Sequence, residues 1–142
     1  MDRWSLVLWV LGVLQIANAF WMLFAPESWY LNLPAGVPDT GPLNVHFVRD
    51  IGCAFFSSGV ALVWAAVTSQ VMVRLACVVL AALFLGGHAA VHLFDLARGA
   101  LGERHWLVDL PGVFAPTLIL AVLVVHFGRQ AQQGDLRETH RD

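Results

Sequence analysis

The sequence predicts an all-α protein, an integral membrane four-helix bundle that forms a single domain over residues 1–142. Hydrophobic residues make up 58% of the chain and charged residues only 13%, with a mean hydropathy of +0.70. Soluble domains carry about 25% charged residues. In addition, four stretches are long and apolar enough to cross a bilayer, which takes roughly 20 helical residues. These observations place the chain in a membrane.

The four predicted membrane helices cover residues 4–24, 45–68, 73–97 and 105–127. The first is similar to a signal peptide, because Arg3 precedes an apolar run and the small residues ANA follow it. The apolar run continues through FWMLF, however, and Asp2 offsets the charge of Arg3, so we expect this helix to be retained. The connections TSQVMVR and ARGALGER are short, which favours antiparallel packing of the helices that they join.

The segment between the first two helices, residues 25–44, contains four prolines. Proline interrupts helical hydrogen bonding, so we expect no helix there. Trp29 and Tyr30 suit the membrane interface, and the segment is predicted to be an ordered external loop that closes the bundle. The polar tail GRQAQQGDLRETHRD is expected to fray.

The charges exclude one class of partner and predict an orientation. All eight basic residues are arginines, and the formal net charge of -2 leaves no broad basic surface for a nucleic acid. Cytoplasmic flanks of membrane helices carry an excess of arginine. Five arginines lie on the side of the two chain termini and three on the other side. Both termini are therefore predicted to be cytoplasmic, with residues 25–44 and 98–104 outside.

Three of the predicted helices carry polar stripes at the same end of the bundle. The motif GGHAAVHLFDLARG places His88, His92 and Asp95 at i, i+4 and i+7, which share one face of an α-helix. The second helix repeats this spacing, and the fourth has its first two members. These residues are His46, Asp50 and Cys53, followed by His105 and Asp109.

Such stripes predict a buried polar centre with a metal ion. Ionisable side chains at membrane depth cost a few kcal/mol and normally face the bundle interior. Imidazole and carboxylate are the usual ligands of Zn, Fe and Mn, and facing helices supply them in bundles. We predict a divalent transition metal, Zn, Fe or Cu. The candidate ligands are His46, Asp50, His88 and His92, with Asp95, His105 and Asp109 as further ligands or as groups that orient the imidazoles.

Two neighbouring residues extend this prediction. Arg49 is expected to be an electrostatic partner of the carboxylates or, alternatively, an interfacial anchor. Cys53 is a candidate ligand that would suit Cu, whereas a lone intramembrane cysteine more often packs as a small hydrophobe. Cys53 and Cys77 fall at different depths of the predicted helices, which disfavours a disulfide.

The main alternative is a network of hydrogen bonds and ion pairs without a metal. In that case Asp95 pairs with Arg98 at the interface, and His46 and His105 lie in headgroup water. Haem is a further alternative, because two histidines on facing helices can hold its iron. It ranks below a bare metal, since haem has no use for three nearby carboxylates.

Asp109 has an alternative role of its own. Pro111 follows it by two residues, a spacing in which Asp109 caps the start of the last helix. Its spacing to His105 would then not be helical.

The polar centre favours a metal-dependent membrane protein, most simply an enzyme that acts on a lipophilic substrate entering from the bilayer, with residues 25–44 as its lid. A metal carrier or proton pathway would continue the polar groups toward the inner face, where the last three helices offer mainly Ser57, Ser58 and Thr117. A subunit of a larger membrane complex would need no site. A homo-oligomer stays open, since Ala82 and Gly86 allow close helix contact.

The stretch GVPDTGPLNVHFVRDIG, residues 36–52, resembles small uncharacterised bacterial four-helix membrane proteins in which an NxHFVRD element follows a Pro/Gly loop. The later GGHAAVHLFD agrees with this resemblance. It implies the four-helix architecture and a prokaryotic origin, and we predict that the protein is in the bacterial inner membrane. That group has no assigned function, so the resemblance implies no catalytic residue.

Overall fold

The computed structural model describes residues 2–139, which are all-α and contain no strand. Four helices in this part of the chain are long and apolar enough to cross a membrane, as predicted. The helices are α1 (Arg3–Phe24), α2 (Pro26–Asn32), α3 (Val45–Val67), α4 (Val71–Ala97), α5 (His105–Val108) and α6 (Ala115–Thr139), with a 3-10 turn at Val37–Thr40 and a π turn at Leu110–Phe114.

Polar caps define the first turns of two long helices. The Asp2 side chain accepts hydrogen bonds from the backbone N–H groups of Trp4 and Ser5, at 2.8 and 2.9 Å. The Asn44 side chain accepts one from the Phe47 N–H at 3.1 Å. Each cap satisfies backbone donors that have no partner inside the helix. The sequence thus fixes where α1 and α3 begin.

The proline-rich segment is helical in part, which corrects the prediction that its four prolines exclude a helix. Pro26 lies in the first turn of α2, where a helix has no need of the N–H that proline lacks. The next prolines confine the helix to seven residues, and the 3-10 turn follows. The Tyr30 hydroxyl donates to the Gly41 carbonyl at 2.8 Å and ties the segment together.

The fourth predicted helix is not continuous from 105 to 127. It is divided into α5, the π turn that contains Pro111, and α6, because proline cannot supply the N–H that an unbroken helix needs. α6 then continues to Thr139, so most of the tail that we expected to fray is helical. Residues 140–142 of that tail lie outside the described residues.

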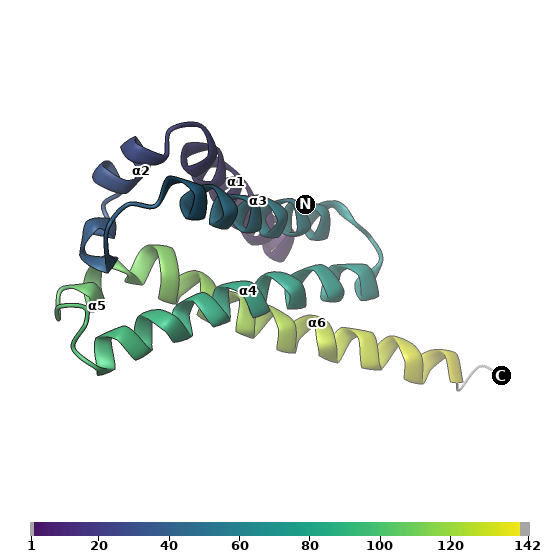
Figure 1. Cartoon of the computed structure of the whole chain (residues 1–142). Coiled ribbons are helices and arrows are strands. Elements are labelled where there is room, and N and C mark those ends of the chain that lie inside the picture. The colour runs from purple at the N-terminus through teal and green to yellow at the C-terminus, as the bar shows by residue number, and fades with distance from the viewer. Residues whose placement is uncertain (1, 140–142) are drawn as a thin grey trace.

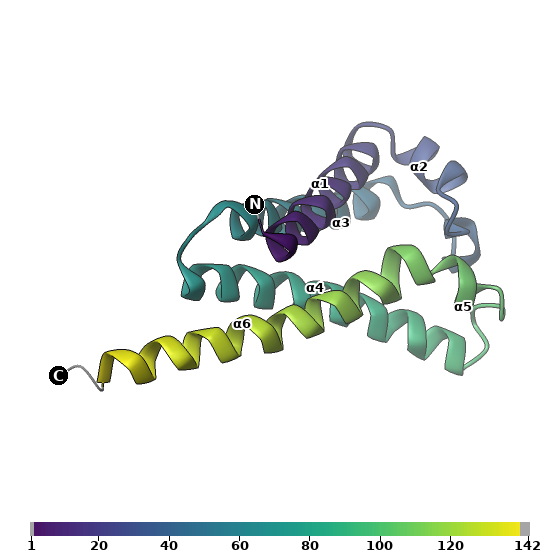
Figure 2. The same ribbon diagram turned by 180° about the vertical axis from the view of Figure 1, so that it is seen from behind.

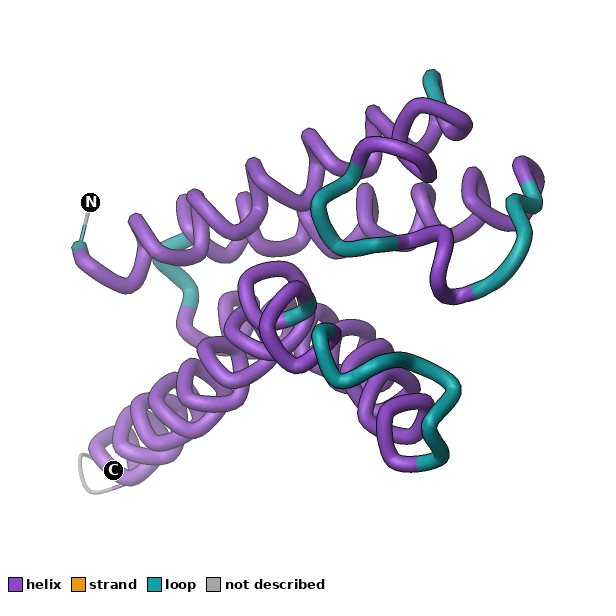
Figure 3. Tube along the Cα trace, turned by 90° about the vertical axis from the view of Figure 1, so that its left-hand side faces the viewer, coloured by secondary structure: helices purple, strands orange, loops and turns teal. Residues whose placement is uncertain are grey.

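The long helices form two hairpin-like pairs, α1 with α3 and α4 with α6, joined by contacts between α3 and α4. Figure 1 shows the two pairs one above the other, and Figure 2 shows the same arrangement from behind. In Figure 3 the pairs are seen to cross at an angle. α1 and α3 approach each other closely at Gly12 and Gly59, where a Cβ on either glycine would lie 2.8 Å from the carbonyl oxygen of the other.

Two contacts made by residues near the N-terminus define one end of the molecule. Arg74, at the start of α4, lies 3.7 Å from Asp2, and the ring of Trp4 lies 5.1 Å from that of His126 in α6. We call this the terminal end. The opposite end, formed by residues 25–44 and 98–109, is called the loop end.

Candidate functional site

A continuous network of imidazoles and carboxylates occupies the loop end. Asp109 and His105 are both 0% exposed. The Oδ2 atom of Asp109 lies 2.7 Å from Nδ1 of His92 and 3.2 Å from Nδ1 of His105. The other ring nitrogen of His105, Nε2, lies 3.1 Å from Oδ2 of Asp39. Four polar side chains from three separate segments thus meet in one hydrogen-bonded line.

Local helix geometry positions the inner part of this network. The Asp109 N–H donates to the His105 carbonyl at 3.1 Å, so the two side chains keep the i, i+4 spacing that puts them on one face. The Asp109 side chain makes no capping hydrogen bond. The backbone carbonyl of Asp109 instead accepts hydrogen bonds from the N–H groups of Val113 and Phe114 in the π turn, at 2.8 and 3.2 Å. The carboxylate is therefore free to face His92 of α4, and the capping alternative is wrong.

The proline-rich segment supplies the outer part of the network. Asp39 accepts a hydrogen bond from Nε of Arg104 at 3.1 Å and pairs with the Nη2 group of the same guanidinium. The hydrogen bond from His105, and then Arg104, hold the pKa of Asp39 below its ordinary value. Gly36, at φ +65°, brings the backbone so close to the Arg104 side chain that a Cβ there would clash with it.

The hydrogen bonds of His105 require one proton more than neutral imidazoles supply. Each of its ring nitrogens faces a carboxyl group, that of Asp109 and that of Asp39. An ionised carboxylate only accepts hydrogen bonds, whereas a neutral imidazole has a single N–H. An additional proton, on His105 or on one of the two carboxyls, would give both ring nitrogens a hydrogen-bonded partner. With the proton on His105 and the charge of Arg104, two positive charges balance two negative ones.

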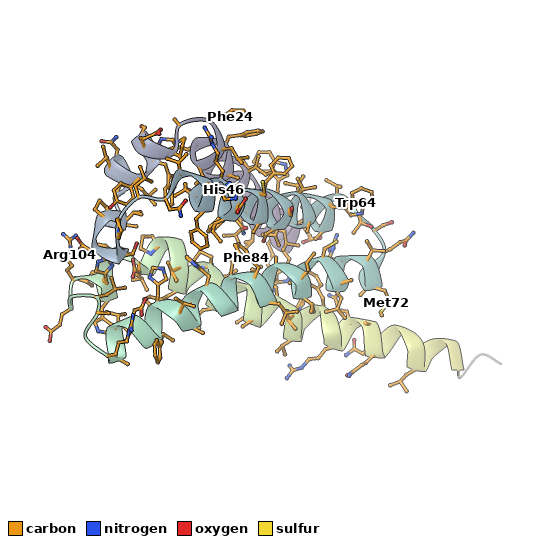
Figure 4. The ribbon with its side chains drawn as sticks, viewed as in Figure 1. Phe24, His46, Trp64, Met72, Phe84 and Arg104 are labelled. Carbon is orange, nitrogen blue, oxygen red and sulfur yellow. The ribbon has the colours of Figure 1, made fainter. Side chains whose placement is uncertain are left out.

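His88 lies beside the inner end of the network, in the membrane-spanning part of α4, and is in ring contact with His92. Its ring centroid lies 4.7 Å from that of His92, and its other ring contacts are Phe55 of α3 and Phe84 of α4, at 5.8 and 6.4 Å. Figure 4 labels Phe84 in the interior and Arg104 at the loop end, which mark the two limits of the network. His88 lies nine residues before the end of α4, or about 13 Å along the helix axis.

Beyond His88 the polar groups do not continue the line. The Thr117 hydroxyl lies 2.7 Å from the Val113 carbonyl and 3.1 Å from the Leu85 carbonyl, and the Ser57 hydroxyl donates to the Cys53 carbonyl. The hydroxyl of the buried Ser58 has no hydrogen-bond partner among the described residues. The network therefore connects the loop end to the interior without reaching the terminal end.

The predicted stripe of α3 does not join the network. His46 and Asp50 pair with each other, with Nε2 of the histidine 3.4 Å from Oδ2 of the aspartate. Their side chains are 89% and 61% exposed, and Cys53 on the same stripe is exposed as well. The expected convergence of all seven residues is thus corrected, because the face of α3 that carries His46 points away from α4.

Two further predicted residues also have partners elsewhere. Asp95 lies 2.9 Å from Arg98, the interfacial ion pair of the alternative interpretation. Arg49 donates from Nε to the Leu23 carbonyl at 3.1 Å, so it joins α3 to the end of α1, and no carboxylate among the described residues pairs with it. Within residues 2–139, no three His, Cys, Asp or Glu side chains are arranged to hold a metal ion.

Sequence reasoning missed Asp39. It lies in a proline-rich loop, where no helical period marks the direction of a side chain, and it is 66 residues from His105. The opposite charges of Asp39 and Arg104, which lie in two loops at the same end of the molecule, could have indicated that Asp39 belongs to the site. That signal is weak, because ionic side chains in loops are usually solvated.

Comparisons with known proteins give no further guide to the site. The chain matches no family model, no curated protein and no solved structure.

Proposed function

We propose that the loop-end network is a proton relay that serves an acid–base site at His88 and His92. The observation that carries this proposal is the position of His105 between two carboxyl groups, Asp39 on its outer side and Asp109 on its inner side. The additional proton in such an arrangement can move toward either carboxyl without a new contact. Asp39, whose side chain is 42% exposed, exchanges it with water.

The inner end of the relay suits a lipophilic reactant. His88 lies against Phe55 and Phe84 in a membrane-spanning helix, so a molecule that meets it comes from the bilayer. An imidazole can act as a general acid or a general base. The proposed function is that of a membrane enzyme that takes a proton from a lipophilic substrate, or gives one to it, and exchanges that proton through His92, Asp109 and His105.

Nitrogen-15 NMR of the histidine rings in nanodiscs tests the relay. We expect both ring nitrogens of His105 to carry hydrogen at neutral pH, because both face a carboxylate. Replacing Asp39 with asparagine removes one charge and is expected to return His105 to a neutral ring. Because the pKa of Asp39 is lowered, its carboxylate stabilises the folded network at any pH above its ordinary pKa. This stabilisation is lost as the pH falls through the lowered pKa.

His126 provides the control for this measurement, because it lies at the terminal end beside Trp4 and Gln130. Its signals are expected to be the same in the Asp39→Asn variant. The relay is contradicted by a neutral His105 in the wild type together with infrared spectra that contain no protonated carboxyl.

A metal ion at His88 and His92 is a second candidate, favoured by the hydrogen bond of His92. Asp109 holds Nδ1 of this ring at 2.7 Å, which leaves Nε2 available, and the His88 ring is adjacent. A carboxylate that orients an imidazole in this way is the common arrangement behind metal ligands. Two imidazoles would leave positions of a Zn, Fe or Cu ion open to water or substrate.

Elemental analysis of protein purified without an affinity tag tests this candidate. We expect about one transition-metal ion per chain in the wild type and none after replacing His88 and His92 with alanine, because both neutral imidazoles would be lost. His46→Ala is the matched control and is expected to retain the metal. A low metal content that the double replacement does not change rules out this candidate and leaves the relay standing.

The proposed location is the bacterial inner membrane, with the loop end outside and both termini in the cytoplasm. The arginine distribution supports this orientation, and the resemblance of residues 36–52 to bacterial membrane proteins supports the location. In this orientation Asp39 exchanges its proton with the outer solution.

A further inference from the structure

α3 carries two heptad stripes on opposite faces, of which only one is covered. The buried stripe packs toward the rest of the bundle and consists of Val48, Gly52, Phe55, Gly59, Leu62 and Ala66. The second stripe is displaced from it by two residues, or about 200° around the helix. Its members are all exposed and are His46, Asp50, Cys53, Ser57, Val60 and Trp64. We call them the outer stripe of α3; Figure 4 labels its ends, His46 and Trp64.

The chemistry of the outer stripe differs from that of a lipid-facing surface. Asp50 lies about 7.5 Å along the helix from its first residue and Ser57 about 18 Å, both within a membrane-spanning helix. By contrast, the exposed side chains of α4 include Leu80, Leu83 and Val91, which suit lipid. Ionisable groups within membrane helices normally face protein, because exposure to hydrocarbon is costly.

We propose that the outer stripe of α3 binds the same stripe of a second copy of this chain, forming a parallel two-fold dimer in the membrane. Two copies with the same topology are related by an axis along the membrane normal, which places each α3 beside its counterpart. Successive residues of the outer stripe are separated alternately by four and by three positions. This is the heptad spacing of left-handed coiled coils. Small side chains at Cys53 and Ser57 allow the two backbones to approach closely.

Charge complementarity selects a second copy as the partner. The stripe contains a histidine and an aspartate one turn apart, and they already pair within the chain at 3.4 Å. In a parallel pair, the side chain at one heptad position packs into a hole that includes the next position of the partner helix. His46 of each copy then meets Asp50 of the other, and both carboxylates gain a second partner. Two identical surfaces therefore satisfy each other.

The native cysteines provide a direct test. Mild oxidation of membranes with copper phenanthroline and dissolved oxygen is expected to join two copies through Cys53, which faces its counterpart at the proposed axis. The two thiols lose two protons and two electrons, which the oxidant accepts. The adduct should persist in the Cys77→Ser variant, since Cys77 is half-buried on α4, and should disappear in the Cys53→Ser variant.

Single cysteines in a background without Cys53 and Cys77 map the face in contact. Ser57→Cys and Val60→Cys are expected to link the two copies, because they lie on the outer stripe. Ala54→Cys and Ala61→Cys, each one residue beyond a stripe position, are expected to link poorly because their side chains point about 100° away. Copies with two different tags, expressed together, identify the partner in each adduct.

The dimer equilibrium in nanodiscs or lipid vesicles tests the role of the charges. Asp50→Ala is expected to raise the dimer Kd about eightfold, because the two-fold symmetry makes the replacement remove two hydrogen bonds, each worth a factor of about 2.8 between membrane helices. Leu83→Ala, on the exposed face of α4, is the matched control and should leave the Kd unchanged. A monomeric wild type without a Cys53 adduct overturns the proposal, and so does an adduct whose partner is another protein. Either result leaves the relay proposal intact, because no residue of the outer stripe belongs to the relay.

Discussion

Replacing Asp109 with alanine is expected to lower the free energy of unfolding by about 3–5 kcal/mol, the usual cost of removing one partner from a buried ionic pair. Asp109 is fully buried and accepts hydrogen bonds from two imidazoles, those of His92 and His105. Without Asp109, the Nδ1 atoms of both rings lose their hydrogen-bond partner and are kept from water. Any charge on His105 also loses its inner counterion. Unfolding measured in lipid bicelles by steric trapping gives this free energy.

Asp95 provides the matched control, because it is an aspartate at the same end whose partner is the exposed Arg98. Asp95→Ala is expected to cost less than about 1 kcal/mol. Asp109→Asn should lie between these two variants, since the amide preserves the shape and one acceptor but not the charge. Equal losses for the alanine variants at Asp109 and Asp95 would show that the network contributes nothing special to stability.

The second large effect is expected at the contact between α1 and α3. A Cβ added to Gly12 would lie 2.8 Å from the Gly59 carbonyl oxygen and from a methyl of Val63, and a Cβ on Gly59 would lie 2.8 Å from the Gly12 carbonyl oxygen. Because a backbone oxygen cannot move alone, the two helices must separate. We expect Gly12→Ala and Gly59→Ala each to destabilise the protein by about 1–3 kcal/mol.

The two glycine variants are expected to be non-additive, because the first replacement already separates the helices at the site of the second. Gly87→Ala in α4 is the control, since a Cβ there meets nothing within 4 Å. It should be neutral or stabilise the helix by up to about 1 kcal/mol. If all three replacements have the same effect, the close contact of α1 with α3 is not a source of stability.

The sequence alone determined the four membrane-spanning helices and the spacing of their polar residues. Their length and hydropathy follow from the thickness of the bilayer, so no tertiary information is required. Helical periodicity likewise placed His88 with His92, and His105 with Asp109, on single faces. The break at Pro111 is likewise a local effect of its missing N–H.

The tertiary structure decided which of the polar faces turn inward. His46 with Asp50 and His105 with Asp109 have the same spacing, yet the first pair is exposed and the second is buried. In a membrane protein both the lipid and the interior are apolar, so hydropathy does not distinguish the two sides of a helix. Gly52 and Gly59 help to decide which face of α3 meets α1, because their missing side chains let α1 approach closely at Met22 and Gly12.

Asp39 shows the same limit for loops. Its contact with His105 joins residues that are far apart in the sequence, and it forms only because the proline-rich segment folds over α5 at the loop end. No periodic pattern constrains the side chains of such a segment. The sequence thus determined that the site consists of imidazoles and carboxylates at one end of a membrane bundle. The packing of neighbouring helices and loops decided which of these residues belong to it.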